Sequence, residues 1–265
     1  MEDVLLNIEN LSVAFQQYDH IFRKRKLEII NGLNLDLKQG EILVVFGASG
    51  SGKSLLAHAI LGLLPDNALV EGTILYKNKL LSKEGLSNLL GQEISFIPQT
   101  INSFNPLMKI SKQIHFSKGK KEGQLQALRQ HLTSFGLGPE VLEAYPSELS
   151  GGMARKVLVS ISIINQPQLI IADEPTPGMD DEGLNYIIDY VRQAKKSATS
   201  ALIISHDIMT SLQFADRIAI FNQGQIVEIA PPDYFEGKGE KFKEQYSKDL
   251  WNALPENGFH LPIKV

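Results

Sequence analysis

The chain has 265 residues, of which 43% are hydrophobic, and it carries a formal net charge of −4 and no cysteine. This length and composition can bury one large core, with or without a subdomain, while the missing cysteine excludes disulfides, thiol catalysis and iron–sulfur ligation. The slightly acidic charge creates no global field that attracts nucleic acid, so we expect no nucleic-acid partner. The acidic start Met-Glu-Asp does not resemble a signal peptide, and no stretch approaches eighteen apolar residues. We therefore expect a cytoplasmic protein.

The first forty residues have the pattern of β-strands. Leu33, Leu35 and Leu37 alternate with other residues and are followed by Gly40, as in a half-buried strand that ends in a turn. A basic run over residues 22–26 precedes them. We expect this run to be a solvated loop between two antiparallel strands, with a phosphate or membrane-surface contact as the alternative.

A glycine-rich segment, residues 47–54, follows an apolar strand at 42–46 and precedes an expected apolar helix at 55–64. It fits the pattern G-x-x-x-x-G-K-[ST], in which glycines let backbone N–H groups surround phosphate oxygens at a helix N-terminus. Lys53 is placed to neutralise the β- and γ-phosphates, and the Ser54 hydroxyl to bind Mg²⁺. The segment predicts a nucleoside-triphosphate site. Its candidate binding residues are Gly47, Ser49, Gly50, Ser51, Gly52, Lys53 and Ser54.

The middle of the chain changes in character. Leu125, Leu128 and Leu132, at three- and four-residue spacing, predict an amphipathic helix within residues 100–159. Apolar strands and a helix then alternate, which predicts an α/β fold with a largely parallel, three-layer sheet. The expected strands are 169–172, 201–205 and 218–221, with a helix at 182–196 and a hairpin turn at 222–224.

We expect one domain over residues 1–265. Its parts would be an α/β nucleotide-binding core with an N-terminal β subdomain (1–99 and 160–230), a helical insertion (100–159) and a C-terminal appendage (231–265).

Two carboxylates end the strand that begins at residue 169. Ligands bind at the carboxyl edge of such sheets, and a hard cation that bridges phosphates favours a carboxylate such as Asp173. Strand alternation directs the following Glu174 to the opposite side, where it could orient or deprotonate an attacking water.

A second candidate anion site lies at residues 150–152, Ser-Gly-Gly, which open a helix that reaches residue 164. A hydroxyl and free backbone N–H groups at a helix start can bind phosphate, although an ordinary helix N-cap explains the same pattern.

Together these segments resemble ABC-type ATPases. Residues 149–153 (LSGGM) are similar to the signature motif of that family, residues 169–174 (LIIADE) to its Walker B motif, and residues 47–54 to its Walker A motif. The resemblance extends over residues 4–230 and implies a P-loop NTPase (RecA-like) fold that hydrolyses ATP with Mg²⁺.

The family also implies roles for single residues. Ser54 and Asp173 would hold Mg²⁺, and Gln99 would complete its coordination as the Q-loop glutamine. Glu174 would be the general base, and His206 would contact the γ-phosphate as the switch histidine. The other histidines show no spacing typical of metal ligands.

In this family two ATPase units pack head-to-tail. Ser150 and Gly152 would then contact the partner's γ-phosphate, and Asp180 is similar to the D-loop aspartate. An aromatic residue, Phe15 or Tyr18, would stack on adenine.

The segment from Gln99 to residue 106 resembles the Q-x-x-x-x-S-x-N-P segment of ATPases of peptide/nickel importers, with one residue fewer between the glutamine and the serine, and LSGGM resembles the same family. This implies two membrane-spanning permease subunits, a solute-binding protein and a second, related ATPase chain, at the cytoplasmic face of the plasma membrane. Residues 103–106 would contact the membrane subunit. The chain departs from the family's basic-glutamine-basic run at 154–156, and the missing cysteine favours the compact nickel or metallophore type.

Two alternatives stay open, a soluble ABC ATPase in DNA repair or translation and a nucleotide-binding regulatory subunit without turnover. The cargo, the direction of transport and the choice between homodimer and heterodimer do not follow from the sequence.

Overall fold

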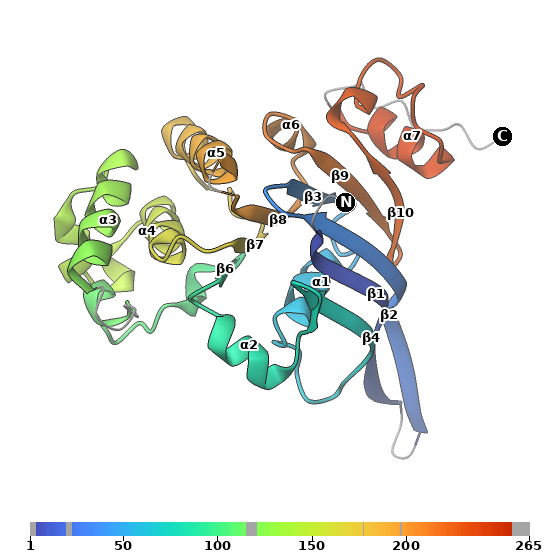
Figure 1. Cartoon of the computed structure of the whole chain (residues 1–265), viewed down its shortest axis with the longest axis horizontal. Coiled ribbons are helices and arrows are strands. Elements are labelled where there is room, and N and C mark those ends of the chain that lie inside the picture. Colours follow the sequence, from blue (N-terminus) through green and yellow to red (C-terminus); the bar gives the residue numbers. More distant parts are fainter. Residues whose placement is uncertain (1–3, 20–22, 115–120, 177, 197, 256–265) are drawn as a thin grey trace. The chain divides into compact units, whose positions relative to one another are not determined.

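The computed structural model describes residues 4–19, 23–114, 121–176, 178–196 and 198–255. The chain divides into two compact units. Figure 1 labels the helices and strands of both. The first unit comprises residues 1–82 and 204–265, and the second comprises residues 83–203.

An antiparallel sheet of order β2-β1-β4-β5 lies in the first unit (Figure 1). Its strands are β1 (Val4–Asp19), β2 (Arg23–Lys38), β4 (Ala68–Tyr76) and β5 (Lys79–Leu80). The predicted alternation is confirmed, because Leu33, Leu35 and Leu37 are buried. The predicted loop at 22–26 is wrong for residues 23–26, which belong to β2 and pair with residues 16–19 of β1. Backbone hydrogen bonding to β1 thus continues through the basic run, and residue 22 lies outside the described residues.

A second set of strands, of order β10-β9-β3, completes the strands of the first unit. β3 (Ile42–Phe46) is buried throughout and runs parallel to β9 (Arg217–Asn222), as predicted from its continuous apolar run. β10 (Gln225–Ala230) is antiparallel to β9, and the predicted hairpin turn is confirmed by the positive φ angles of Gln223 and Gly224.

Helices α1 (Lys53–Ile60) and α6 (Ile208–Ser211) belong to the same unit. The predicted helix at 55–64 is wrong at both ends, because α1 starts directly at the end of the glycine-rich segment. It stops before Gly62, whose φ of 62° is the left-handed conformation that ends many helices.

The C-terminal segment of the first unit contains a 3₁₀ turn (Pro232–Tyr234) and α7 (Gln245–Asn252). Phe235, Phe242 and Trp251 are buried against one another, with ring centroids 4.9 and 5.7 Å apart for the two pairs that include Phe235. These rings form a small aromatic core.

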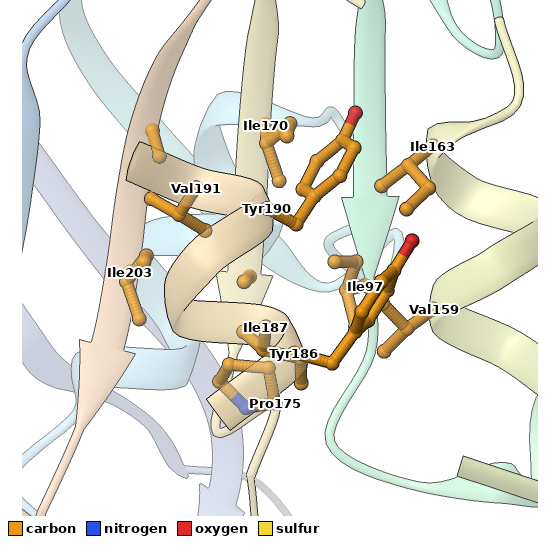
Figure 2. Close-up of a pocket in the computed structure, with 12 residues that line it drawn as sticks. Ile97, Val159, Ile163, Ile170, Pro175, Tyr186, Ile187, Tyr190, Val191 and Ile203 are labelled. Carbon is orange, nitrogen blue, oxygen red and sulfur yellow. The ribbon is translucent and has the colours of Figure 1, made fainter. Parts of the chain in front are cut away.

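The second unit contains strands of order β8-β7-β6. They are β6 (Ile94–Ile97), β7 (Leu169–Asp173) and β8 (Ser200–Ser205), and β8 carries the chain into the first unit. β6 and β7 are parallel, as the α/β pattern predicts. Figure 2 shows Tyr186 and Tyr190 leaving α5 (Asp181–Lys196) on the side of Ile97, Val159 and Ile163, with which they line a cavity of about 20 Å³.

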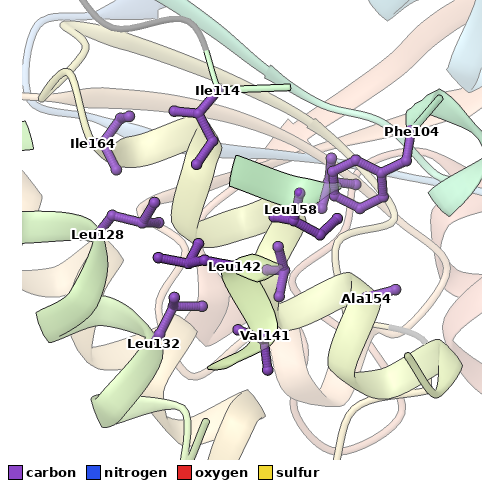
Figure 3. Close-up of a cluster of buried hydrophobic side chains, with 11 residues drawn as sticks. Phe104, Ile114, Leu128, Leu132, Val141, Leu142, Ala154, Leu158 and Ile164 are labelled. Atoms are coloured by element: carbon purple, nitrogen blue, oxygen red, sulfur yellow. The ribbon is translucent and has the colours of Figure 1, made fainter. Parts of the chain in front are cut away.

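The helical part of the second unit has its own hydrophobic cluster (Figure 3). Its helices are α2 (Lys83–Leu89), α3 (Lys121–Ser134), α4 (Gly151–Ile163) and 3₁₀ turns at Ile101–Ser103, Ile110–Lys112, Pro139–Glu143 and Pro146–Glu148. The predicted amphipathic helix is confirmed, because Leu128 and Leu132 are fully buried in the cluster and Leu125 packs against it. Within the described ranges, no helix is both long and apolar enough to cross a bilayer.

Candidate functional site

The glycine-rich segment connects β3 to α1 in the first unit, and two of its glycines are sterically required. A Cβ on Gly47 would lie 2.3 Å from the carbonyl oxygen of Phe221, and a Cβ on Gly52 would lie 2.9 Å from the Ile29 side chain. Gly52 also has a φ of 105°, which L-residues with side chains rarely adopt. The segment therefore needs glycine at both positions to reach the start of α1.

The Lys53 ammonium is held inside this loop. Its side chain is buried, and Nζ donates hydrogen bonds to the carbonyl oxygens of Gly47 at 2.9 Å and Ala48 at 2.7 Å. The first turn of α1 contains no acidic residue and no side-chain cap, so the positive end of the helix dipole faces the loop. The Ser51 hydroxyl is buried without a hydrogen-bond partner in the described structure. A cation, an uncapped helix start and an orphan hydroxyl together suit a phosphate group.

Two further predicted residues belong to the first unit. Phe15 is half-buried on β1, where its backbone pairs with Leu27 and Ala68. The Tyr18 side chain lies outside the described part of the structure, so the choice between these aromatics for adenine stacking stays open.

His206 is exposed at the end of β8. The following Asp207 caps α6 by accepting the Thr210 N–H at 3.0 Å, while its own N–H donates to the Ser205 hydroxyl at 3.0 Å. These bonds fix the turn that presents the imidazole.

The predicted carboxylates end β7 in the second unit. Asp173 is buried at 2% exposure, and Glu174 is partly exposed just beyond the strand. The amide of Gln99 donates to Glu174 Oε2 at 3.1 Å, so the structure brings together two residues that are 75 positions apart. Glu174 lies beyond the end of β7 and its φ of 46° is outside the strand conformation, so strand alternation does not apply to it and its predicted orientation stays a prediction. Such left-handed, non-glycine residues are uncommon and concentrate at functional sites.

The signature residues open α4. The Ser150 hydroxyl accepts the Met153 N–H at 3.2 Å as an N-cap, which confirms the expected cap, and both Ser150 and Gly151 are exposed. A Cβ on Gly152 would lie 2.9 Å from the Gly178 carbonyl oxygen. The start of α4 therefore lies against the segment that contains Asp180.

Two basic residues of α4 bind these loops, and the sequence patterns predicted no role for either. Lys156 Nζ donates to Asp180 Oδ2 at 2.8 Å and to the Phe135 carbonyl oxygen at 3.2 Å. The hydrogen bond from Lys156, together with a second from the N–H of Gly183, lowers the pKa of the Asp180 carboxyl. The Arg155 guanidinium donates to the carbonyl oxygens of Pro98 and Gln99. Two adjacent cations near the start of an otherwise apolar helix are the feature of the sequence that could have indicated these contacts.

The donor set also suits Mg²⁺. This ion is usually held by one or two carboxylates, nucleotide phosphates and water, and not by a full protein cage. The buried Asp173 of the second unit and the Ser54 hydroxyl of the first unit are each oxygen donors of the kind that Mg²⁺ prefers, and their joint role in binding it stays a prediction.

Comparison with known proteins identifies the family. Residues 30–177 match the family model of the ABC transporter. The chain is 33% identical to the oligopeptide transport ATP-binding protein OppD of Bacillus subtilis over 243 residues, which cover 86% of this chain and 66% of the relative. It is 32% identical to the dipeptide transport ATP-binding protein DppD of the same species over 271 residues, covering 96% and 78%.

Solved structures agree on the fold. The dimeric structure of a bacterial ABC transporter cassette matches with a TM-score of 0.73 and 21% identity, over 86% of this chain and 99% of that one. A dimer of an ATP-binding cassette in a post-hydrolysis state with ADP and Pi matches with a TM-score of 0.72 and 22% identity, over 86% and 99%. ATP-binding subunits of ABC transporters act as dimers with membrane permease subunits. This chain belongs to the ABC transporter family and is one of its ATP-hydrolysing ATP-binding domains, a class with which Mg²⁺ is generally associated.

Proposed function

We propose that this chain is the ATP-hydrolysing subunit of a peptide importer and works peripherally at the cytoplasmic face of the membrane. The similarity to oligopeptide and dipeptide transport ATP-binding proteins over most of the chain carries this proposal. Nickel or a metal–chelator complex as cargo stays a prediction of the sequence alone. The partners would be two permease subunits, a solute-binding protein and a second, related ATPase chain.

For the hydrolysis step, Glu174 is the proposed general base. Its carboxylate would accept a proton from the water that attacks the γ-phosphate, while the amide of Gln99, 3.1 Å away, holds that carboxylate. Lys53 would neutralise charge on the β- and γ-phosphates, and His206 would contact the γ-phosphate. The products are ADP and inorganic phosphate.

The second half of each nucleotide site would come from a partner ATPase. Ser150 and Gly151 are exposed at the start of α4, where backbone N–H groups and the helix dipole can meet a phosphate of another subunit. Closure of a head-to-tail dimer would then be required for turnover.

The proposed contact with the permease is the segment 103–108. Phe104 is anchored in the hydrophobic cluster, while Leu107 next to it is 84% exposed and Met108 is 39% exposed. Exposed large apolar side chains on a braced loop are typical of a docking site. Gln113 braces the loop by donating to the carbonyl oxygens of Asn105 and Met108.

The test is Glu174→Gln in the chain reconstituted with its permease partners. We expect turnover to fall about 10²- to 10⁴-fold with ATP binding retained, and ATP to drive the variant into a stable dimer on gel filtration. The exposed Glu122→Gln is the matched control and should keep full turnover. Retained turnover in Glu174→Gln would refute the general-base assignment.

The proposed docking segment is tested separately with Leu107→Ser. This variant should keep ATP binding and lose co-purification with the permease, together with ATP-driven uptake of labelled peptide into proteoliposomes. Normal uptake by this variant would show that the permease docks elsewhere.

A further inference from the structure

A buried cation on α4 contacts the backbone next to the proposed catalytic glutamate. Arg155 is only 7% exposed, and its guanidinium donates to two consecutive carbonyl oxygens, that of Pro98 at 2.7 Å and that of Gln99. The planar guanidinium matches this pair, because its N–H groups form a rigid fork that a lysine ammonium lacks. Arg155 is thus attached to the Q-loop backbone at two points.

Burying the positive charge of Arg155 at this position costs free energy. Burial lowers the pKa of the Arg155 guanidinium, while the negative charges of Glu174 and Asp173 act in the opposite direction. Its Nε–H is buried without a hydrogen-bond partner in the described structure. A buried charge with an unsatisfied donor is seldom favourable for stability alone. Its geometry indicates a role in placing the loop it holds.

The loop held by Arg155 leads directly to Glu174. Gln99, whose carbonyl oxygen binds the guanidinium, donates through its side-chain amide to Glu174 Oε2. A continuous series of contacts therefore runs from α4 through the backbone of residues 98–99 to the carboxylate. All of these residues belong to the second unit.

The other side of α4 is fixed in the helical part of the unit. Ala154, Val157 and Leu158 belong to the hydrophobic cluster of Figure 3, in which Ala154 and Leu158 are labelled. Because close-packed helices move as units, a displacement of the helical part would carry Arg155 with it. Arg155 would in turn move the Gln99 backbone.

We propose that Arg155 is a positioning residue that fixes the Gln99 backbone to α4 and, through the Gln99 amide, sets the orientation of the Glu174 carboxylate. This inference rests on the proposed role of Glu174 in hydrolysis. Both printed contacts of the Arg155 guanidinium are to the protein backbone, and the proposal assigns it no contact with ATP. Its loss should therefore lower kcat and leave the KM for ATP nearly unchanged, because small misplacements of a catalytic group are costly for the chemical step.

The test is a double-mutant cycle with Arg155→Gln and Gln99→Ala, measured as steady-state ATPase activity of the transporter complex. Alone, Arg155→Gln should lower kcat about 10-fold or more and change KM less than about 2-fold. In the Gln99→Ala background the same change should cost less than about 2-fold, because the residue through which it acts is gone. Equal losses in both backgrounds would overturn the proposal.

Arg155→Lys tests the fork separately from the charge, and it serves as the second variant if Arg155→Gln does not fold. We expect its kcat to resemble that of Arg155→Gln, since a lysine keeps the charge but cannot bind both carbonyls in the same way. Full activity of Arg155→Lys would overturn the proposal. Ser160→Ala is the matched control, because this buried hydroxyl of α4 donates to the Lys156 carbonyl oxygen and, among the described residues, has no hydrogen bond to residues 98–99.

The Glu174→Gln variant and the double-mutant cycle together distinguish a failure of the Arg155 proposal from a failure of the proposed hydrolysis mechanism. If Glu174→Gln keeps its turnover, the general-base assignment fails. If Glu174→Gln is inactive and the cycle is additive, only the role of Arg155 is refuted.

Discussion

Replacing Lys53 by methionine should separate nucleotide binding from folding in the first unit. Methionine keeps an apolar stem but removes the ammonium that donates to the carbonyl oxygens of Gly47 and Ala48. Ala48 is exposed, so its carbonyl oxygen can accept a hydrogen bond from water instead. Gly47 is buried, so its carbonyl oxygen loses the hydrogen bond from Lys53 without a replacement. One unsatisfied buried acceptor costs about 1–3 kcal/mol. The variant without nucleotide should therefore fold, with a modest decrease in Tm.

The effect on ATP binding should be much larger. Two unit charges about 4 Å apart near a protein surface interact with about 4 kcal/mol, which is a factor of about 10³ in Kd. At an ATP concentration about 100 times its Kd, the wild-type chain gains about 2.7 kcal/mol, or roughly 5–10 °C in Tm. At the same concentration the variant would be far below saturation and would gain less than about 0.1 kcal/mol.

The assay is thermal unfolding with and without ATP and Mg²⁺, followed by titration with a fluorescent ATP analogue. Lys79→Met, an exposed lysine on β5 of the same unit, is the control and should keep the full ATP-dependent rise in Tm. A Lys53→Met variant that folds and still shows that rise would refute the placement of the phosphates beside this ammonium.

Three further predictions concern stability. Leu128→Ala should lower the free energy of unfolding by about 2–5 kcal/mol in urea titrations, because Leu128 is fully buried in the cluster of Figure 3, and a loss under about 1 kcal/mol would contradict that packing. Gly47→Ala should destabilise the chain and weaken ATP binding, since the new Cβ would lie 2.3 Å from the Phe221 carbonyl oxygen; normal ATP affinity would argue against this close approach. The hydrogen bond from Arg217 lowers the pKa of Asp36, so this pair contributes stability above the unfolded pKa of about 3.9 and loses it as the pH falls through the lower folded pKa. Arg217→Met should therefore be less stable than the wild type at pH 7 and approach it in urea titrations near pH 3, and a pH-independent difference would refute the assignment.

Local patterns predicted much of the fold. The strand at 42–46 was predicted with its observed bounds because a continuous apolar run ends at a glycine-rich loop, and the helix at 182–196 begins only one residue earlier than expected. The basic run at 23–26 was predicted as loop because its pairing partners lie on another strand, whose register does not appear in local composition. The sequence therefore predicts an element well when the residues that decide its conformation lie within it.

The candidate site also contains features that local sequence determines and features that distant residues determine. The pattern around Lys53 is local, and the loop and helix form where the motif requires them. The φ of Glu174 and the contact of its carboxylate with Gln99 are not local, because a bond across 75 residues sets them. Strand alternation therefore cannot be applied to Glu174, a residue proposed for catalysis.

Arg155 and Lys156, the two cations of α4, connect the helix that begins with the exposed signature residues to two separate loops. Neighbouring residues on a helix point about 100° apart, and accordingly Arg155 reaches the backbone of residues 98–99 while Lys156 reaches Asp180. One turn of helix thus holds two loops, one next to Glu174 and one next to the start of α5. If a partner subunit binds Ser150 at the start of α4, any displacement of this helix would reach both loops through Arg155 and Lys156. Closure of the dimer could therefore move the two loops together.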